Sequence, residues 1–343
     1  MESENVAVIG AGSWGTALAI SLAKGGHHVS LWARREDAAR LMSEERHNPT
    51  YLPDAIIPDS VHVTHDLAEA IHGATIWLIA TPSQTVRQVA KDLDSYLTPD
   101  VVVVSVAKGI ENGTLLTTSC VLHDAFSDLP RDRIAVLYGP SHAEEVASEC
   151  PTTVVAASTN RETAKRVQRT FMTCHLRVYV NHDTRGVEIA GSVKNVLAIA
   201  AGISDGVGFG DNAKAAILTR GLAEIKRLGV AMGADPSTFA GLAGIGDMVV
   251  TCMSTLSRNR NLGYELGKGK SLERVQSEMT MVAEGVRTTA SVVELAKKYE
   301  VEMPITEAVY RILFENEPPR EAVSTLMMRT AKQEAWTPID TDD

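Results

Sequence analysis

Short apolar runs alternate with helical stretches through the first half of the chain. The runs are rich in Val, Ile and Leu and fall at 6–9, 29–32, 76–79, 101–104, 134–137, 153–156 and 176–179. Helix-favouring stretches lie between most of them, at 15–24, 83–96, 141–149 and 161–172. Strands that are apolar throughout and joined by helices are typical of a parallel sheet covered on both faces. The pattern therefore predicts an α/β region built on a mostly parallel sheet.

Beyond residue 185 the pattern changes to helical periodicity. Apolar residues recur every three or four positions, at Leu218, Leu222, Ile225 and Leu228. Charged residues between them are expected to face solvent, at Arg220, Glu224 and Arg227. Asp211 is expected to cap this helix. Similar patterns follow at 272–279, 291–299 and 305–314. We predict an α/β domain at 1–185, an all-helical domain at 186–335 and a frayed acidic tail at 336–343.

The longest apolar stretch, 187–203, carries Glu188 and Lys194. Two ionisable side chains in such a segment indicate a buried helix rather than a membrane span, which needs about 18 apolar residues. The first strand-like run begins at Val6 and leaves no room for the apolar core of a signal peptide. These features predict a cytoplasmic protein without integral membrane contact.

The charge balance narrows the class of partner. The 343 residues include 33 Lys and Arg against 43 Asp and Glu, a net charge of −10. An acidic surface disfavours a nucleic-acid backbone or an anionic membrane as the main partner, so we expect no nucleic acid. A small anionic ligand remains compatible with this charge if basic groups gather in one cleft.

The cysteines and histidines do not indicate a metal site. None of the ten histidines recurs at metal-ligand spacing, and we interpret them as surface or core residues, His142 included. The four cysteines form no C-x-x-C pair, so reduced thiols are expected at Cys120, Cys150, Cys174 and Cys252.

A glycine-rich turn follows the first apolar run. Gly10, Gly12 and Gly15 match G-x-G-x-x-G directly after a strand and at the start of an Ala- and Leu-rich helix, as the motif requires. The first glycine permits a tight turn, the second lets the backbone approach a pyrophosphate, and the third lets helix and strand pack closely. An ordinary strand–helix turn is the alternative. The context favours a Rossmann-type dinucleotide site, with phosphates on the helix N-terminus near Ser13 and Trp14.

Two arginines follow the second apolar run. A site selective for NAD usually has an acidic residue here that binds the ribose 2′-hydroxyl. Arg34 and Arg35 instead suit a 2′-phosphate, which a guanidinium binds through paired hydrogen bonds. The alternative is a solvated pair balanced by Glu36 and Asp37. We predict NADPH as the cofactor, with NADH as the second choice.

Five later regions carry candidate residues for binding a substrate or a cofactor. Their residues are Lys108; Gly139, Ser141 and Ala143; Lys194 and Asn195; Asp247 with Ser257, Arg258 and Asn259; and Val282 with Glu284. Lys108 follows the run at 101–104, so it stands at the carboxyl end of a strand, where open α/β sheets bind ligands. Lys194 lies in an apolar helix at the junction of the two halves.

In this order the segments closely resemble those of the bacterial NAD(P)-dependent glycerol-3-phosphate dehydrogenases, from about residue 6 to about residue 332. The resemblance implies reversible hydride transfer between the nicotinamide and C2 of dihydroxyacetone phosphate, forming sn-glycerol 3-phosphate for glycerophospholipid synthesis. It implies that Lys194 donates and accepts the proton, with Asn195 beside the substrate. The implied substrate-binding set is Lys108, Gly139, Ser141, Lys194, Asp247, Ser257, Arg258 and Asn259. The implied cofactor set is Ser13, Trp14, Arg34, Arg35, Lys108, Ala143, Arg258, Val282 and Glu284, beside the motif glycines Gly10, Gly12 and Gly15.

A lysine can supply the proton only if its pKa falls from about 10.4 towards neutrality. Burial of Lys194 in an apolar helix and a nearby Lys108 would both lower this pKa, whereas Asp247 would raise it. The sequence leaves open which effect is larger. It also leaves open a lysine at a helix edge whose ammonium reaches solvent.

Two rival functions share some of these features. The β-hydroxyacid and 6-phosphogluconate dehydrogenases also use a helix lysine, but with an asparagine one turn later, whereas Asn195 is adjacent to Lys194. A non-catalytic NADPH sensor would not need Lys108, Lys194 and Asp247 together. We expect a homodimer, from packing of the helical domain.

Overall fold

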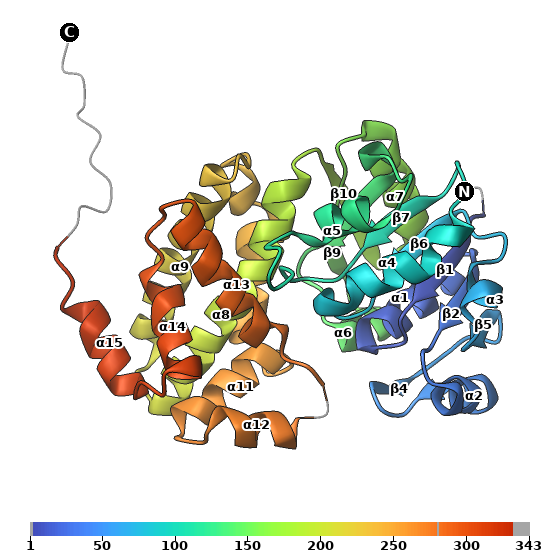
Figure 1. Cartoon of the computed structure of the whole chain (residues 1–343). Coiled ribbons are helices and arrows are strands. Elements are labelled where there is room, and N and C mark those ends of the chain that lie inside the picture. Colours follow the sequence, from blue (N-terminus) through green and yellow to red (C-terminus); the bar gives the residue numbers. More distant parts are fainter. Residues whose placement is uncertain (1–2, 280, 332–343) are drawn as a thin grey trace, which may run out of the picture.

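The computed structural model describes residues 3–279 and 281–331, and the acidic tail predicted at 336–343 lies outside them. The first half forms a sheet covered by helices, and the second half is a helical bundle beside it (Figure 1). The predicted fold class, a Rossmann-type mostly parallel sheet followed by an all-helical region, is confirmed.

In the described part of the chain, the main sheet has eight strands in the order β10-β9-β8-β7-β6-β1-β2-β5. These are β1 Asn5–Ile9, β2 His28–Trp32, β5 Val61–Thr64, β6 Ile76–Ile79, β7 Val102–Ser105, β8 Ile134–Tyr138, β9 Thr152–Ala157 and β10 Leu176–Asn181. From β5 to β8 all neighbours are parallel, in the order of a dinucleotide-binding Rossmann sheet. β9 runs antiparallel to β8, and β10 runs parallel to β9. The chain therefore reverses direction in the sheet before it enters the helical half.

Alternating side chains on each strand enter two separate cores. On β1, Val6 and Val8 face one cluster while Ala7 and Ile9 face the other. The first cluster packs under α1 Ser13–Lys24, α2 Glu36–Glu45, α6 Ala143–Ala147 and α7 Arg161–Phe171. The second packs under α3 Leu67–Ile71, α4 Val86–Leu93 and α5 Thr118–Ala125. The sheet is thus covered on both faces, as the wholly apolar runs predicted.

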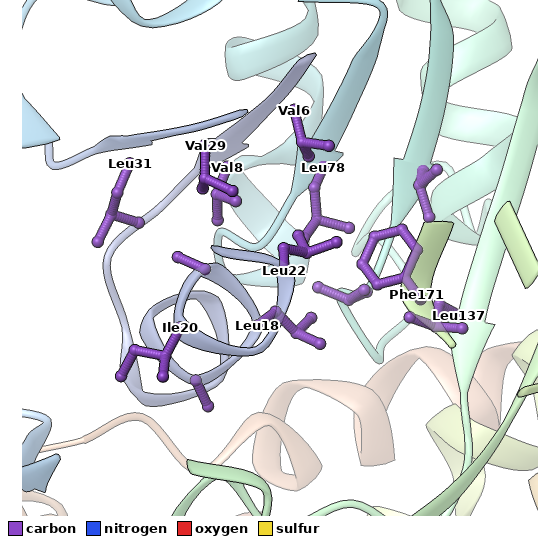
Figure 2. Packing of buried hydrophobic residues seen from close by; sticks show 14 of the residues in the cluster. Val6, Val8, Leu18, Ile20, Leu22, Val29, Leu31, Leu78, Leu137 and Phe171 are labelled. Carbon is purple, nitrogen blue, oxygen red and sulfur yellow. The ribbon is translucent and has the colours of Figure 1, made fainter. Parts of the chain in front are cut away.

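Helix α1 is held tightly against the sheet. Figure 2 shows Leu18 and Leu22 of this helix beside Leu78 of β6, Leu137 of β8 and Phe171 of α7. All five side chains are buried. This packing fixes the direction of α1, whose N-terminus begins at the glycine turn.

The helical half is assembled around α8 Thr184–Val207. The other helices are α9 Asp211–Ala231, α10 Asp247–Met253, α11 Arg258–Gly267, α12 Leu272–Glu278, α13 Glu284–Lys298, α14 Pro304–Phe314 and α15 Pro319–Met327. Within the described residues, α8 is the one helix that is long and apolar enough to cross a membrane, and its apolar window is entirely buried inside the protein. It is the core helix predicted at 187–203.

Helices α8 and α11 approach to backbone contact. A Cβ added at Gly202 of α8 would lie 2.0 Å from the Arg260 carbonyl oxygen, and one at Gly263 of α11 would lie 2.1 Å from the Ile199 oxygen. Only glycine allows such an approach. The start of α11 also lies near Lys194, because a Cβ on Gly285 would be 2.7 Å from Asn259 Oδ1 and 2.8 Å from the carbonyl oxygen of Asn195.

Two expectations for α9 are wrong. Asp211 does not cap the helix: Gly210, with φ +83°, is the N-cap, and Asp211 is already the first helical residue. Its carboxylate is therefore one position too late to accept the first free N–H groups. Glu224 does not face solvent either, because it is buried and accepts hydrogen bonds from the backbone N–H groups of Ile305 and Thr306. A missing cap on α14 explains why a glutamate occupies this buried position.

Short elements account for what the patterns missed. Strand β5 is only four residues long and contains His62, and the hairpin β3 His47–Asn48 with β4 Leu52–Ile56 is a separate two-stranded sheet. Neither has a wholly apolar run, because neither is enclosed on both faces.

Candidate active site

The glycine turn lies where the strand order reverses, between β1 and β6. A Cβ on Gly10 would lie 2.9 Å from the Ala80 carbonyl atoms after β6, and one on Gly15 would lie 1.9 Å from the Gly10 oxygen. A Cβ on Gly12 would meet no atom within 4 Å. Gly10 and Gly15 thus allow the turn to form, whereas Gly12 leaves open space at the N-terminus of α1. Space at this point suits a pyrophosphate.

Asn48 supports the turn from the small hairpin. Its side-chain amide donates to the Ala11 carbonyl oxygen at 2.9 Å and to Thr16 Oγ1 at 2.8 Å, and the residue is buried. Ser13 is buried in the first turn of α1, and Trp14 is half-buried against the core. Asn48 was not predicted from the sequence, because it lies 37 residues from the carbonyl that it holds.

Arg34 and Arg35 lie just after β2, at the same edge of the sheet as the glycine turn, and both are exposed. Arg35 Nε lies 3.9 Å from Asp37 Oδ1, a weak surface pair. Arg34 makes no hydrogen bond or ion pair with another described residue. An unengaged guanidinium here leaves its donors free for a ligand.

Two lysines from opposite halves meet on one buried carboxylate. Lys108 Nζ donates to Asp247 Oδ2 at 2.7 Å and to the Gly139 carbonyl oxygen at 3.0 Å. Lys194 Nζ donates to the other oxygen, Asp247 Oδ1. Asp247 begins α10 and is only 1% exposed. The structure therefore brings together three of the predicted site residues, which are separated by up to 139 positions.

Lys194 has an unusual protonation balance. Burial is the largest influence and, with Lys108, lowers its pKa to about 7, although Asp247 acts in the opposite direction. Burial therefore decides the balance that the sequence left open. A pKa near neutrality lets one amine both donate and accept a proton.

Thr251 is a further partner of Lys194 that was not predicted from the sequence. Lys194 Nζ donates to Thr251 Oγ1 at 2.6 Å, and this hydroxyl donates to the Asp247 carbonyl oxygen at 2.6 Å. Thr251 is four residues after Asp247, so both lie on one face of α10. That i, i+4 spacing is the signal that could have identified it.

The segment after β8 closes one side of the lysine pair. Gly139 has φ +147°, and a Cβ there would lie 2.9 Å from Val154 Cα. Ser141 Oγ donates to the Gly139 oxygen at 3.0 Å, and Ala143 begins α6. His142 occupies the N-cap position of α6 without a side-chain capping hydrogen bond, and its Nε2 is buried without a hydrogen-bond partner in the described residues. Burial lowers the His142 pKa, and both site lysines contribute. The prediction that His142 is a plain surface or core residue overlooked its place beside them.

The segment 257–259 begins α11. Ser257 Oγ accepts from the Arg260 backbone N–H at 3.3 Å, and Asn259 Oδ1 accepts from the Gly285 N–H at 2.9 Å. Both residues are buried. Arg258 makes no hydrogen bond or ion pair among the described residues; it keeps solvent access although surrounding protein lowers its pKa by removing water. This combination is expected of a cation within an open cleft.

Glu284 joins α13 to the sheet. Its carboxylate accepts from Ser83 N at 3.2 Å and from Ser83 Oγ at 2.5 Å, just after β6. Burial raises the Glu284 pKa, while Ser83 and Arg258 oppose that rise. Val282 is exposed, at 56%. Glu284 thus ties the start of α13 to the segment after β6, and Val282 lies two residues before it.

These features define a class of protein. A dinucleotide cradle at the switch point of a Rossmann sheet faces a lysine of near-neutral pKa supplied by a helical second half. This is the architecture of a nicotinamide-dependent dehydrogenase.

Comparison with known proteins identifies the family. The family models for the NAD-dependent glycerol-3-phosphate dehydrogenase N-terminus and C-terminus match residues 5–164 and 183–324. The chain is 60% identical to a glycerol-3-phosphate dehydrogenase [NAD(P)+] of Salinibacter ruber, over 98% of each chain. It is 54% identical to one of Chlorobium phaeobacteroides, over 96% of this chain and 98% of the relative. A crystal structure of glycerol-3-phosphate dehydrogenase from Coxiella burnetii superimposes with a TM-score of 0.91 at 40% identity, over 95% of this chain and 99% of the other. The chain belongs to the NAD-dependent glycerol-3-phosphate dehydrogenase family.

Proposed function

We propose that the protein reduces dihydroxyacetone phosphate to sn-glycerol 3-phosphate with NAD(P)H and so supplies glycerophospholipid synthesis. The observation that carries the proposal is the buried Lys194, whose pKa is lowered to about 7 beside Asp247 and Lys108. Family membership supports the same reaction, because the relatives in both bacteria are named glycerol-3-phosphate dehydrogenase [NAD(P)+].

The chain's own residues handle the proton. When bound, the reduced nicotinamide supplies a hydride to C2 of the ketone. Lys194, as the ammonium, gives a proton to the C2 oxygen, so the carbonyl becomes a secondary alcohol and the amine is left neutral. Asp247 and Thr251 hold the amine in place throughout, through the contacts described above. In the reverse direction the neutral amine takes the proton back.

Local positive charge resolves the problem of an acidic protein binding a dianion. The proposed phosphate ligand is Arg258, whose guanidinium has no partner in the described residues, with Ser257 and Asn259 beside it. Lys108, Gly139 and Ser141 are proposed to bind the other end of the substrate. Asp247 is proposed to contribute by holding the Lys108 ammonium in place.

The proposed cofactor site runs along the carboxyl edge of the sheet. The open space at Gly12 fits a pyrophosphate, with Gly10, Ser13, Trp14 and Gly15 forming the turn around it. The proposed nicotinamide end is bounded by Lys108, Ala143, Arg258, Val282 and Glu284. Arg34 and Arg35 are proposed to bind a 2′-phosphate, which makes NADPH the preferred cofactor and NADH the second.

We further propose a cytoplasmic homodimer. An exposed apolar strip on and beside α10 supports self-association, because Ile245, Met253 and Leu256 are 41%, 57% and 44% exposed. Light scattering after size exclusion tests this assembly, and a mass of one chain at micromolar concentration would contradict it.

Substrate comparison tests the proposed reaction directly. Loss of reduced-nicotinamide absorbance is followed with dihydroxyacetone phosphate, using NADPH and NADH in separate assays. The reverse reaction is measured with sn-glycerol 3-phosphate and with 3-hydroxyacids. Turnover confined to the phosphorylated C3 substrates supports the proposal. Turnover of a 3-hydroxyacid, or tight NADPH binding without any turnover, would contradict it.

A further inference from the structure

A buried glutamate ties the helix of Lys194 to the sheet half of the molecule. Glu188 lies six residues before Lys194 on α8 and is 1% exposed. Its carboxylate accepts from Thr117 Oγ1 and Thr118 Oγ1, each at 2.9 Å, and from the Ser119 backbone N–H at 2.7 Å and hydroxyl at 2.5 Å. All four donors belong to the start of α5, so a carboxylate from one half caps a helix of the other.

The same hydrogen bonds continue to the loop that carries Lys108. Ser105 Oγ donates to Thr118 Oγ1 at 3.0 Å and accepts from the Ala107 N–H at 3.3 Å. The Tyr138 hydroxyl lies 3.2 Å from Thr118 Oγ1 and donates to the Ala107 carbonyl oxygen. Both polar atoms of Ala107, the residue before Lys108, are therefore held by groups that contact Thr118.

The Tyr138 ring completes the support of this loop. Lys108 Nζ lies 5.7 Å from the ring centroid, within range of a cation–π contact. A Cβ added at Gly191 of α8 would lie 2.6 Å from Tyr138 Cδ2, so α8 packs directly on this ring. The path from Lys108 through Asp247 to Lys194 then leads back to α8. The two lysines are thus joined by a closed ring of contacts, with Glu188 on the side opposite Asp247.

We propose that Glu188 is a positioning residue for the reaction, which sets the place of Lys108 relative to Lys194. This inference rests on the proposed roles of the two lysines. Glu188 touches neither of them. It acts by fixing α8 against α5 and, through Thr118, the Ser105–Ala107 segment that ends at Lys108.

The energetics favour a role beyond filling space. A buried carboxylate is costly unless every lone pair is satisfied, and removing one partner of such a network leaves the rest unpaired. An apolar residue here would avoid that cost but would leave the start of α5 and the loop before Lys108 unlinked to α8. Six helical residues span about 9 Å, so a small tilt of α8 at Glu188 displaces Lys194 as well.

A weakened ring has a definite chemical consequence. If Lys108 moves away from Asp247, Lys194 loses a neighbouring positive charge and gains a larger share of the carboxylate. Both changes raise the Lys194 pKa. Ketone reduction needs the Lys194 ammonium, so the fall of kcat at alkaline pH moves to higher pH. Misplacement of Lys108 and Lys194 also lowers kcat by roughly 10- to 100-fold.

The variants are Glu188→Gln, Thr118→Val and, as a matched control, Glu224→Gln. Glu224 is also a buried glutamate that caps a helix of another segment, but it caps α14 within the helical half. Glu188→Gln keeps one acceptor oxygen and the side-chain volume. Thr118→Val removes the hydroxyl between Glu188 and Ser105 while the other three donors to Glu188 remain. If Glu188→Gln does not fold, Thr118→Val tests the positioning role by itself.

The measurements are kcat against pH for ketone reduction, NADPH affinity by fluorescence titration, and thermal unfolding. For Glu188→Gln and Thr118→Val we expect a lower kcat, whose fall at alkaline pH is shifted to higher pH. NADPH affinity should change far less than kcat, because Lys108 borders only the nicotinamide end while the glycine turn and Arg34 lie outside the altered contacts. Glu224→Gln is expected to change unfolding alone. The positioning role would be overturned if kcat fell at the same alkaline pH in all variants, or if this pH shifted in the control as well.

Lys194→Ala belongs in the same series because it separates two kinds of failure. If Lys194→Ala turns over normally, the proposed function fails. If Lys194→Ala is inactive while Glu188→Gln and Thr118→Val behave like the control, the proposed function stands and only the positioning role fails.

Discussion

The two halves of the molecule prepare the site in opposite ways. At the edge of the sheet the site depends on glycines that lack a side chain. Gly12 leaves open space, and Gly15 lets α1 start against Gly10. In the helical half the site depends on charged side chains, because α8 and α10 bring the buried Lys194 and Asp247 together. The first half is suited to hold a ligand, and the second to move a proton. Each kind of preparation should fail in its own way when altered.

The largest expected effect is on the charged side. Lys194→Ala removes the proposed proton donor, and kcat should fall by about 10³-fold or more while NADPH still binds. Steady-state rates and fluorescence titration measure the two quantities separately. Lys268→Ala, which changes an exposed lysine near α11, serves as the control. Near-normal turnover of Lys194→Ala would eliminate its role as general acid.

The pH dependence of the two reaction directions should be opposite. With a Lys194 pKa of about 7, ketone reduction should fall roughly tenfold for each pH unit above that value, because the ammonium is lost. Alcohol oxidation should fall in the same manner below it, because the amine must be neutral. Profiles of kcat in both directions check this. If kcat fell on the same side of pH 7 in both reaction directions, the titration would belong to another group.

On the glycine side, two substitutions should separate space for the ligand from space for the fold. Gly12→Ala meets no protein atom and has φ −76°, so stability should stay unchanged while cofactor affinity falls about tenfold or more. Gly15→Ala places a Cβ 1.9 Å from a backbone oxygen and should destabilise the fold by about 1–3 kcal/mol or more. Unfolding curves and NADPH titration distinguish the two. Full affinity in Gly12→Ala would place the pyrophosphate elsewhere.

Exchange of the arginines after β2 should have a smaller effect. Arg34→Ala with Arg35→Ala should weaken NADPH about tenfold and leave NADH nearly unchanged, because only NADPH carries the 2′-phosphate. The ratio of kcat/KM for the two cofactors is the measurement. An unchanged ratio would favour the surface pair of Arg35 with Asp37 as the sole role of this segment.

The smallest expected effect on activity concerns a glutamate far from the chemistry, whose change acts on stability alone. Burial raises the Glu224 pKa to about 7 from its ordinary 4.5. A raised carboxyl pKa adds stability below about pH 4.5, and that stability is lost as pH rises through 7, by about 1–3 kcal/mol. Urea unfolding at several pH values should therefore show a flatter profile for Glu224→Gln than for the parent. Parallel profiles would mean that the carboxyl titrates normally.

The fold could be predicted largely from local patterns. The seven apolar runs became seven strands of the main sheet. Inner strands such as β6 and β8 are apolar throughout because they are enclosed on both faces. β5 and the small hairpin were not predicted, since their residues are not enclosed in this way. Asp211 was assigned wrongly because α9 begins at that residue and Gly210 takes the N-cap position. Glu224 was assigned wrongly because a helix pattern shows which face is charged but not which neighbour needs a cap.

The site was predicted unevenly. The glycine turn could be located because all its requirements lie within six consecutive residues. Lys108, Asp247 and Lys194 were singled out, but their convergence on one carboxylate depends on helices packed from distant parts of the chain. Thr251 and Asn48 were not predicted, because their significance arises only from such packing.

By itself, the sequence determined the strand and helix order, the position of the dinucleotide turn and the residue types available for chemistry, since these depend on near neighbours and on side-chain identity. Only the tertiary structure decided the protonation of Lys194, because burial and the distances to Asp247 and Lys108 outweigh any local property. It also decided that Glu188 and Glu224, similar residues in similar helices, cap different partners. Electrostatic energies depend on distance and on the surrounding medium, and both are set when the two halves pack together.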